Sequence, residues 1–139
     1  MQSRLIVRVD SDAMRQVDVF VAGFVDARGV AAEEAHRILI LLEELLTNLV
    51  KYGYPDGREP GRAEIELALK GDRLEIVFID DGCAFDPFAG PPPDLDQPLE
   101  GRPLGGLGLH LLRSMCDETR YERRNDRNVI RLARKIASR

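Results

Sequence analysis

A pair of strand patterns in the middle of the chain restricts the fold most. Residues 62–70 alternate between apolar and polar side chains, and residues 73–80 form a second extended run after a Gly71-Asp72 turn. This pattern predicts two strands joined in a hairpin. Residues 76–79 are apolar throughout, which is typical of a strand with both faces covered and neighbours on both sides. The chain therefore needs a larger sheet with a layer packed against it.

Three further segments have strand patterns. Residues 2–9 alternate, and their apolar face carries Leu5, Val7 and Val9. Near the end of the chain, residues 118–124 and 127–134 predict a second hairpin that turns around Asn125-Asp126.

Two long segments have the spacing of amphipathic helices. The first follows Asp10 or Ser11, either of which we expect to cap it, and it closes at Gly29. The second, about residues 31–52, is the longest helical pattern in the chain. Its apolar stripe consists of Ile38, Leu42, Leu45 and Leu49. A shorter helix is expected over residues 108–116.

The order of these elements predicts an α+β fold. It is a two-layer sandwich with helices packed on one face of a mostly antiparallel sheet. At 139 residues we expect a single domain over residues 1–139. Between the central hairpin and the short helix, about residues 83–105, the chain is proline-rich and has no periodicity. A long loop of this kind inside a compact domain is usually functional or mobile.

Composition excludes several classes of function. The chain has 20 Lys and Arg against 24 Asp and Glu, a net charge of −4, which argues against direct binding to nucleic acid. We expect the basic residues that gather late in the chain to lie on the solvated side of the last strands. These are Arg120, Arg123, Arg124, Arg127, Arg131, Arg134 and Lys135.

The sequence also predicts a protein without a membrane segment. No apolar run approaches the ~20 residues of a membrane helix. The first residues run directly into a strand pattern, so we expect no signal peptide. Cys83 and Cys116 make no disulfide framework. We therefore expect a cytoplasmic setting.

The long helix has one polar face with distinctive residues. Glu44, Thr47, Asn48 and Lys51 are spaced so that they share this face, whereas Glu43 points about 100° away from Glu44. An ordinary solvated helix face would have the same spacing. Asparagine, however, is unfavourable inside a helix, and its carbonyl oxygen is a fitting ligand for Mg²⁺.

A second candidate site is Asp80-Asp81-Gly82, at the end of the central strand. Asp-Gly is common in plain turns. A fixed carboxylate can also accept a hydrogen bond from the exocyclic amine of adenine, and a glycine lets a base approach the backbone closely. This stretch by itself is compatible with both a plain turn and an adenine-binding site.

The third candidate is the glycine-rich run Gly105, Gly106, Leu107, Gly108 and Leu109 before the short helix. Many helices follow such turns. No Gly-Lys dipeptide occurs in the chain, and the run does not follow a strand in a βαβ unit, so two common phosphate-binding fingerprints are disfavoured. Backbone NH groups at a helix start that face a negative ligand remain as the functional interpretation.

In this order the three stretches resemble the ATP-binding superfamily of type II topoisomerases, heat-shock chaperones, histidine kinases and mismatch-repair ATPases. The 44–48 stretch resembles the N box, and residues 80–82 and 106–108 resemble the two glycine boxes. The segment between the glycine boxes, about 83–105, corresponds to the ATP lid.

Within that superfamily the chain most resembles the anti-sigma-factor serine/threonine kinases of bacterial partner-switching systems. The stretches that carry the resemblance are residues 47–48 with 52–55, residues 80–87, and residues 105–112 with 116–118. The N box of these kinases often ends in His, whereas here it reads Lys51-Tyr52. The proline-rich lid is a second departure.

The resemblance implies a role for each matching residue. Glu44 would be the general base, Asn48 the Mg²⁺ ligand, Asp80 the reader of the adenine amine, and Gly82 the residue against the base. Lys51 or Arg102 would neutralise phosphate charge. The triphosphate would be lined by Gly105, Gly106, Leu107, Gly108 and Leu109. The cofactors would be ATP and Mg²⁺.

The resemblance also implies partners. They would be an anti-anti-sigma-type protein as substrate and a sigma factor or other regulator as the sequestered protein, with a homodimer as a further option. Three rivals remain open: a non-catalytic nucleotide-gated binding module, an ATPase domain of a larger signalling kinase, and an α+β domain with coincidental boxes. Glu44 argues against the first, because a mere binder needs no base.

Overall fold

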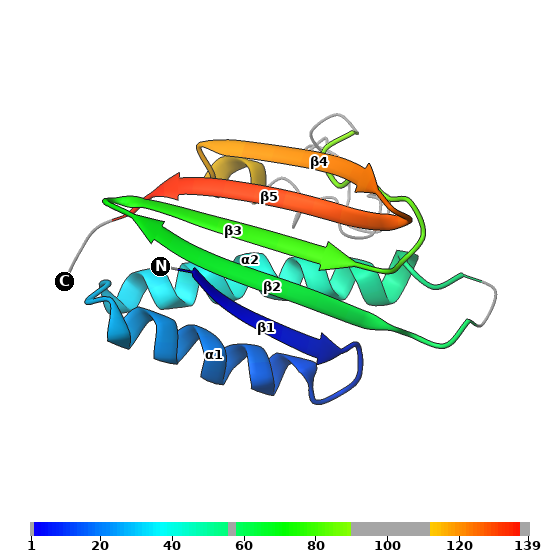
Figure 1. The fold of residues 1–139 in the computed structure, drawn as a ribbon, viewed down its shortest axis with the longest axis horizontal. Helices are drawn as coiled ribbons and strands as arrows, with labels where there is room; N and C mark the ends of the chain where they lie inside the picture. The colour runs from blue at the N-terminus through cyan, green and yellow to red at the C-terminus, as the bar shows by residue number, and fades with distance from the viewer. Residues whose placement is uncertain (1, 56–57, 90–111, 137–139) are drawn as a thin grey trace, which may run out of the picture.

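The structure is a computed structural model and describes residues 2–55, 58–89 and 112–136. Figure 1 shows a layer of two long helices beneath a sheet. The elements are β1 (Gln2–Arg8), α1 (Ala13–Ala27), α2 (Ala32–Tyr52), β2 (Arg62–Lys70), β3 (Arg73–Asp80), β4 (Glu118–Arg124) and β5 (Arg127–Lys135). Residues 112–115 are also helical. The predicted α+β two-layer sandwich is confirmed.

The strand order in the sheet is β1-β2-β3-β5-β4, and every neighbouring pair is antiparallel. The strand predicted to be central, β3, lies in the middle. Its register places Asp80 opposite both Ala63 on β2 and Asn128 on β5. The last residue of β3 and the start of β5 therefore meet at one end of the sheet.

The core lies between the sheet and the two helices. The four residues of the predicted α2 stripe are all buried, and they face the buried side of β3, which carries Leu74, Ile76 and Phe78. Because side chains alternate along a strand, Asp80 continues the same face two residues beyond Phe78. The strand itself thus aims this carboxylate at the helix layer.

The predicted cap of α1 was wrong. The residue before the helix is Asp12, not Asp10 or Ser11. Asp10 Oδ1 instead accepts the Asp12 backbone NH at 2.9 Å and closes the turn between β1 and α1. The predicted end of α1 is confirmed, since Gly29 adopts a φ of 64°, which glycine tolerates without strain.

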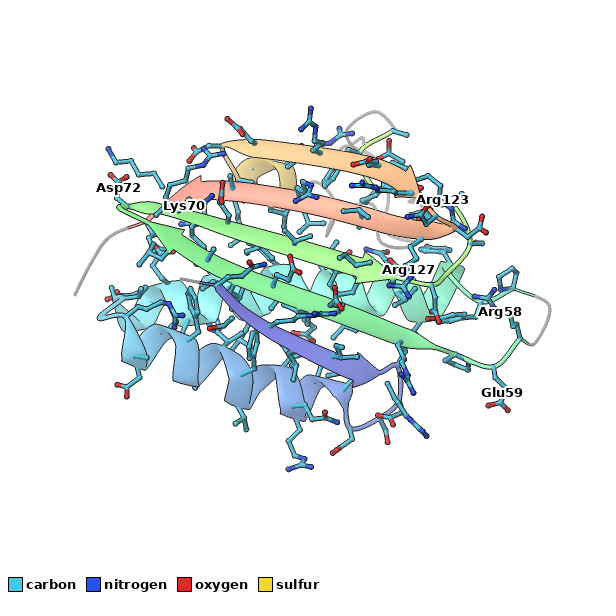
Figure 2. The ribbon with its side chains drawn as sticks, in the orientation of Figure 1. Arg58, Glu59, Lys70, Asp72, Arg123 and Arg127 are labelled. Atoms are coloured by element: carbon cyan, nitrogen blue, oxygen red, sulfur yellow. The ribbon has the colours of Figure 1, made fainter. Side chains whose placement is uncertain are left out.

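The late basic residues divide between two sides of the sheet. Most are exposed as predicted, and Figure 2 shows Arg123 and Arg127 at the same end of the sheet as Arg58. Arg134 departs from the prediction because its position in β5 faces the helices. Its Nη2 lies 3.2 Å from a carboxylate oxygen of the buried Glu34, and its Nη1 donates to Met115 O at 2.6 Å. Arg134 therefore ties β5 to α2 and to residues 112–115.

Among the described residues, no helix is long and apolar enough to cross a membrane.

Candidate functional site

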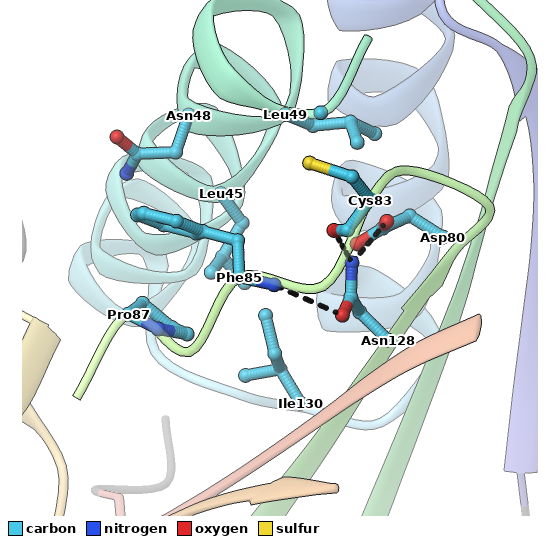
Figure 3. Close-up of a pocket in the computed structure, with 10 residues that line it drawn as sticks. Leu45, Asn48, Leu49, Asp80, Cys83, Phe85, Pro87, Asn128 and Ile130 are labelled. Atoms are coloured by element: carbon cyan, nitrogen blue, oxygen red, sulfur yellow. Dashed lines mark hydrogen bonds between the residues drawn. The ribbon is translucent and has the colours of Figure 1, made fainter. Parts of the chain in front are cut away.

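A small cavity lies where the end of β3 meets α2 and the start of β5 (Figure 3). Its lining consists of Leu45, Asn48, Leu49, Gly53, Asp80, Cys83, Phe85, Pro87, Asn128 and Ile130. The view places Asn48, Phe85 and Pro87 on one side and Asp80, Cys83 and Asn128 on the other. The structure thus brings together Asn48 and Asp80, two of the predicted site residues.

The cavity holds about 20 Å³ of free space, roughly enough for a single water molecule. A purine therefore requires the lining to open. Phe85 is the largest side chain of that lining, and its ring stacks on Tyr52 with the ring centres 5.2 Å apart. It comes from the segment after β3, outside the sheet and the long helices.

Asn48 presents an unsatisfied oxygen. Its side chain is 3% exposed, and its Nδ2 donates to both the backbone oxygen and Oε1 of Glu44, each at 2.9 Å. Its Oδ1 is buried and accepts no hydrogen bond from the residues that the structure describes. A buried acceptor without a partner is costly unless a ligand satisfies it. An amide oxygen of this kind suits a hard cation such as Mg²⁺, which needs few protein ligands when phosphates supply the rest.

Glu44 lies on the same face of α2 as Asn48, as its position in the helix predicted. It is half-buried, and its carboxylate is oriented by the bond from the Asn48 amide. The neighbouring Glu43 is exposed. Of the two acids only Glu44 is therefore placed beside the cavity residue Asn48.

The Asp80 carboxylate is buried and held by two donors. The side chain is 5% exposed, and its Oδ1 accepts the Gly82 NH at 2.8 Å and Asn128 Nδ2 at 2.9 Å. In the described part of the chain, its other oxygen accepts no hydrogen bond. Burial raises the pKa of Asp80, while the bonds from Asn128 and Gly82 lower it. The site therefore offers a fixed acceptor with one oxygen available.

Gly82 lets two turns pack closely. A methyl group at this position would lie 2.8 Å from Leu49 Cδ1 and 3.0 Å from both Asp80 Oδ1 and the Cα of Gly53. The turn after β3 thus packs on the end of α2 only because no side chain intervenes. The predicted contact between Gly82 and a base stays a prediction.

Asp81 faces away from the cavity and holds a loop. It accepts the Tyr54 hydroxyl at 2.5 Å and the Arg62 NH at 3.2 Å, and its backbone oxygen accepts Arg58 Nη2 at 2.7 Å. Burial and the bond to Asp81 raise the pKa of Tyr54. Gly61 packs so tightly on this group that a side chain there would overlap the Asp81 carboxylate. Asp81 is therefore structural, whereas Asp80 belongs to the cavity.

We expect Gly61→Ala to lower the free energy of unfolding by about 1–3 kcal/mol, since the added methyl group displaces the Asp81 carboxylate from its donors. Urea unfolding followed by circular dichroism measures this. Gly23→Ala is the matched control, because a methyl group there meets nothing within 4 Å and helix α1 favours alanine. Equal stability of Gly61→Ala and the wild type would show that Asp81 does not hold the loop.

The predictions from sequence assigned no role to several residues of the cavity. Asn128 bonds to Asp80, and Cys83 Sγ lies 3.1 Å from the Tyr52 oxygen. A signal for Asn128 was present, because it starts the row of alternate residues that continues with Ile130 and Leu132. A polar residue at the head of a buried apolar row usually has hydrogen-bonding partners.

Other predicted site residues do not join the cavity or cannot be placed. Lys51 is exposed and is not among the described residues that line it. The glycine-rich run lies outside the described residues, as does most of the segment predicted to be the lid. That run consists of Gly105, Gly106, Leu107, Gly108 and Leu109.

Comparison with known proteins agrees with this architecture. Residues 7–134 match the family described as "Histidine kinase-like ATPase domain". The chain belongs to this family. Members are ATPase domains, so the family places the chain among nucleotide-using proteins.

Named relatives confirm the resemblance drawn from the motifs. "Serine-protein kinase RsbW" of Bacillus cereus (strain G9842) is 33% identical over an alignment of 103 residues, and the match covers 70% of this chain and 62% of that protein. The protein of the same name from Bacillus mycoides (strain KBAB4) is 32% identical over 103 residues, with the same coverage. The match thus spans about 62% of the length of these relatives.

A solved structure shares the fold. The crystal structure of the RsbU and RsbW domains of a Mycobacterium tuberculosis protein superposes with a TM-score of 0.66 at 16% identity. The superposition covers 99% of this chain and 32% of that one. At this identity the likeness concerns the fold alone.

Proposed function

We propose that this chain is an ATP-dependent serine/threonine protein kinase that acts as an anti-sigma factor. It would phosphorylate a serine of an anti-anti-sigma-type antagonist and sequester a sigma factor or similar regulator. The observation that carries the proposal is the hydrogen bond between Glu44 and the cavity residue Asn48, whose Oδ1 has no partner among the described residues. The relatives named as serine-protein kinases support the same activity.

The two sides of the cavity suit the two ends of ATP. The free oxygen of Asp80 would accept the adenine amine, with Gly82 close to the base. At the other side, Asn48 Oδ1 would bind Mg²⁺, and Lys51 would approach the phosphates from the end of α2. The triphosphate would be lined by Gly105, Gly106, Leu107, Gly108 and Leu109.

Phosphoryl transfer depends mainly on positioning and on neutralising charge. Mg²⁺, when bound, supplies charge neutralisation at the phosphates. Glu44 would accept the proton of the substrate serine while the serine oxygen bonds to the γ-phosphorus and ADP departs. The half-buried position of Glu44 leaves the carboxylate within reach of a protein substrate, and the Asn48 amide holds it in place.

We also propose that residues 1–139 act as one domain in the cytoplasm and that the lid spans about residues 83–105. A homodimer is compatible with the resemblance, and size-exclusion chromatography with light scattering would establish it.

A pull-down in Mg-ADP and in Mg-ATP tests the proposed function. The captured proteins are then incubated with the chain and γ-labelled ATP. We expect label on a serine of one captured protein, and a different captured protein that remains unlabelled. Capture without any transfer would favour a nucleotide-gated binding module. Absence of Mg-ATP binding by calorimetry would overturn the proposal altogether.

A further inference from the structure

The buried amide of Asn128 faces the cavity with both of its donors engaged. The side chain is 3% exposed, and its Nδ2 donates to Asp80 Oδ1 at 2.9 Å and to the Cys83 backbone oxygen at 2.8 Å (Figure 3). A carboxamide nitrogen carries two hydrogens. No donor of Asn128 is therefore left for a ligand.

The oxygen of the same amide is also occupied. Asn128 Oδ1 accepts the Tyr121 hydroxyl at 2.6 Å, Arg123 Nη1 at 3.1 Å and the Phe85 NH at 3.4 Å. The Arg123 guanidinium and the Phe85 NH can only donate, so an amide turned the other way would place its NH₂ against them. The donors on this side thus fix the orientation of the amide, and the nitrogen must face Asp80.

Asn128 in turn fixes which oxygen of Asp80 is free. With Asn128 Nδ2 and the Gly82 NH both on Oδ1, the carboxylate has a single oxygen left to accept a bond from a ligand. We infer that Asn128 is a positioning residue that sets the base specificity of this site by holding Asp80 as an acceptor for the purine 6-substituent. The inference rests on the proposed nucleotide-binding function.

A fixed acceptor distinguishes an amine from a carbonyl at this position of the purine. Adenine offers an NH₂ group to the free oxygen of Asp80, whereas hypoxanthine presents a carbonyl oxygen that the carboxylate repels. Loss of a hydrogen bond to a charged group predicts a preference for ADP over IDP of about 10- to 100-fold in the wild type.

Two variants of similar shape test the inference in the full chain. Asn128→Asp keeps an acceptor for Tyr121, Arg123 and Phe85 but replaces the donor that faces Asp80 with an oxygen. Asn128→Leu removes both polar atoms. Calorimetric dissociation constants for ADP and IDP, each with Mg²⁺, are the measurement. We expect the preference for ADP to fall by about 10-fold in both variants.

A third variant leaves Asn128 in place, and we expect it to fold even if the two Asn128 variants do not. Tyr121→Phe removes the shortest hydrogen bond to Asn128 Oδ1, so the amide is held less firmly against Asp80. We expect a smaller fall in the preference for ADP, about threefold. Leu132→Val controls for loss of stability, because Leu132 is buried on the same strand as Asn128 but does not line the cavity. This variant should leave the preference for ADP unchanged.

The outcomes separate the inference from the function on which it rests. A wild type that binds neither nucleotide would overturn both. The inference alone would be overturned by a different result. In that case the wild type prefers ADP, and folded Asn128→Asp or Asn128→Leu protein prefers ADP over IDP to the same degree. If neither of these folds, an unchanged preference in Tyr121→Phe overturns it.

Discussion

Replacing Glu44 with glutamine should reduce phosphoryl transfer to the antagonist by about 10²- to 10⁴-fold while ATP binding changes little. Glutamine keeps an oxygen that can accept the bond from Asn48 Nδ2, which now reaches Glu44 Oε1 at 2.9 Å. The Asn48 amide therefore keeps its orientation. The glutamine cannot take the proton of the serine hydroxyl. Single-turnover transfer from γ-labelled ATP and calorimetry with Mg-ATP measure the two quantities separately.

Glu43→Gln is the matched control, because it removes the same charge from the adjacent residue of the same helix. Glu43 is exposed and lies on a different side of α2 from Asn48. We expect wild-type transfer and binding in this variant. Transfer at the wild-type rate in Glu44→Gln would remove Glu44 from the mechanism. A parallel loss of ATP binding would instead assign it a structural role through Asn48.

Local patterns predicted most of the fold. The bounds of β2 and β3 agree with the alternating runs, and α2 buries the predicted stripe, because these periods depend only on neighbouring residues. The start of α1 was misplaced because Asp10, Ser11 and Asp12 are all good capping residues. Which of them begins the helix depends on where the chain leaves β1, and the sheet decides that.

Only the part of the site that local patterns mark was predicted from the sequence. Asn48 and Asp80 each stand out locally, one as a polar residue inside a helix and the other as an acid at a strand end. The separate roles of Asp80 and Asp81 follow from the face that each one takes beyond Phe78. Asn128 was missed because its role depends on the pairing of β3 with β5, which are far apart in sequence and whose register no local pattern specifies.

We expect Asp80→Asn to weaken ATP binding by about 100-fold without loss of stability. An asparagine can still accept the Gly82 NH and Asn128 Nδ2 with one oxygen. Its NH₂ would then face the adenine amine, so that two donors oppose each other where a charged acceptor had been. Calorimetry with Mg-ATP and Mg-ITP measures the loss, which should spare ITP because its carbonyl can accept from the new amide.

The stability of this variant follows from the raised pKa of Asp80. When a carboxyl group has a higher pKa in the folded state than in the unfolded chain, the protein loses stability as pH rises. The loss develops between the ordinary pKa of the group and its raised pKa. At neutral pH the full cost of the buried charge is present, and Asp80→Asn removes it. Urea unfolding at neutral pH should therefore give equal or greater stability.

Acidification tests the same carboxylate in the wild type. ADP affinity should fall as pH drops through the raised pKa of Asp80, since the protonated group loses its charged acceptor. Burial raises this pKa, Asn128 and Gly82 lower it by hydrogen bonds, and the charges of Asp81 and Arg123 raise and lower it respectively. The part of the pH dependence due to Asp80 should be absent in Asp80→Asn.

Asp81→Asn is the control for charge at the same turn, and it should behave in the opposite way. Asp81 bonds to Tyr54 and to the Arg62 NH outside the cavity, so its loss should lower stability while nucleotide affinity is retained. Weak ATP binding in Asp81→Asn with normal binding in Asp80→Asn would reverse the assignment of the adenine acceptor. Because the two residues are adjacent, only the alternation of β3 separates a binding residue from a structural one.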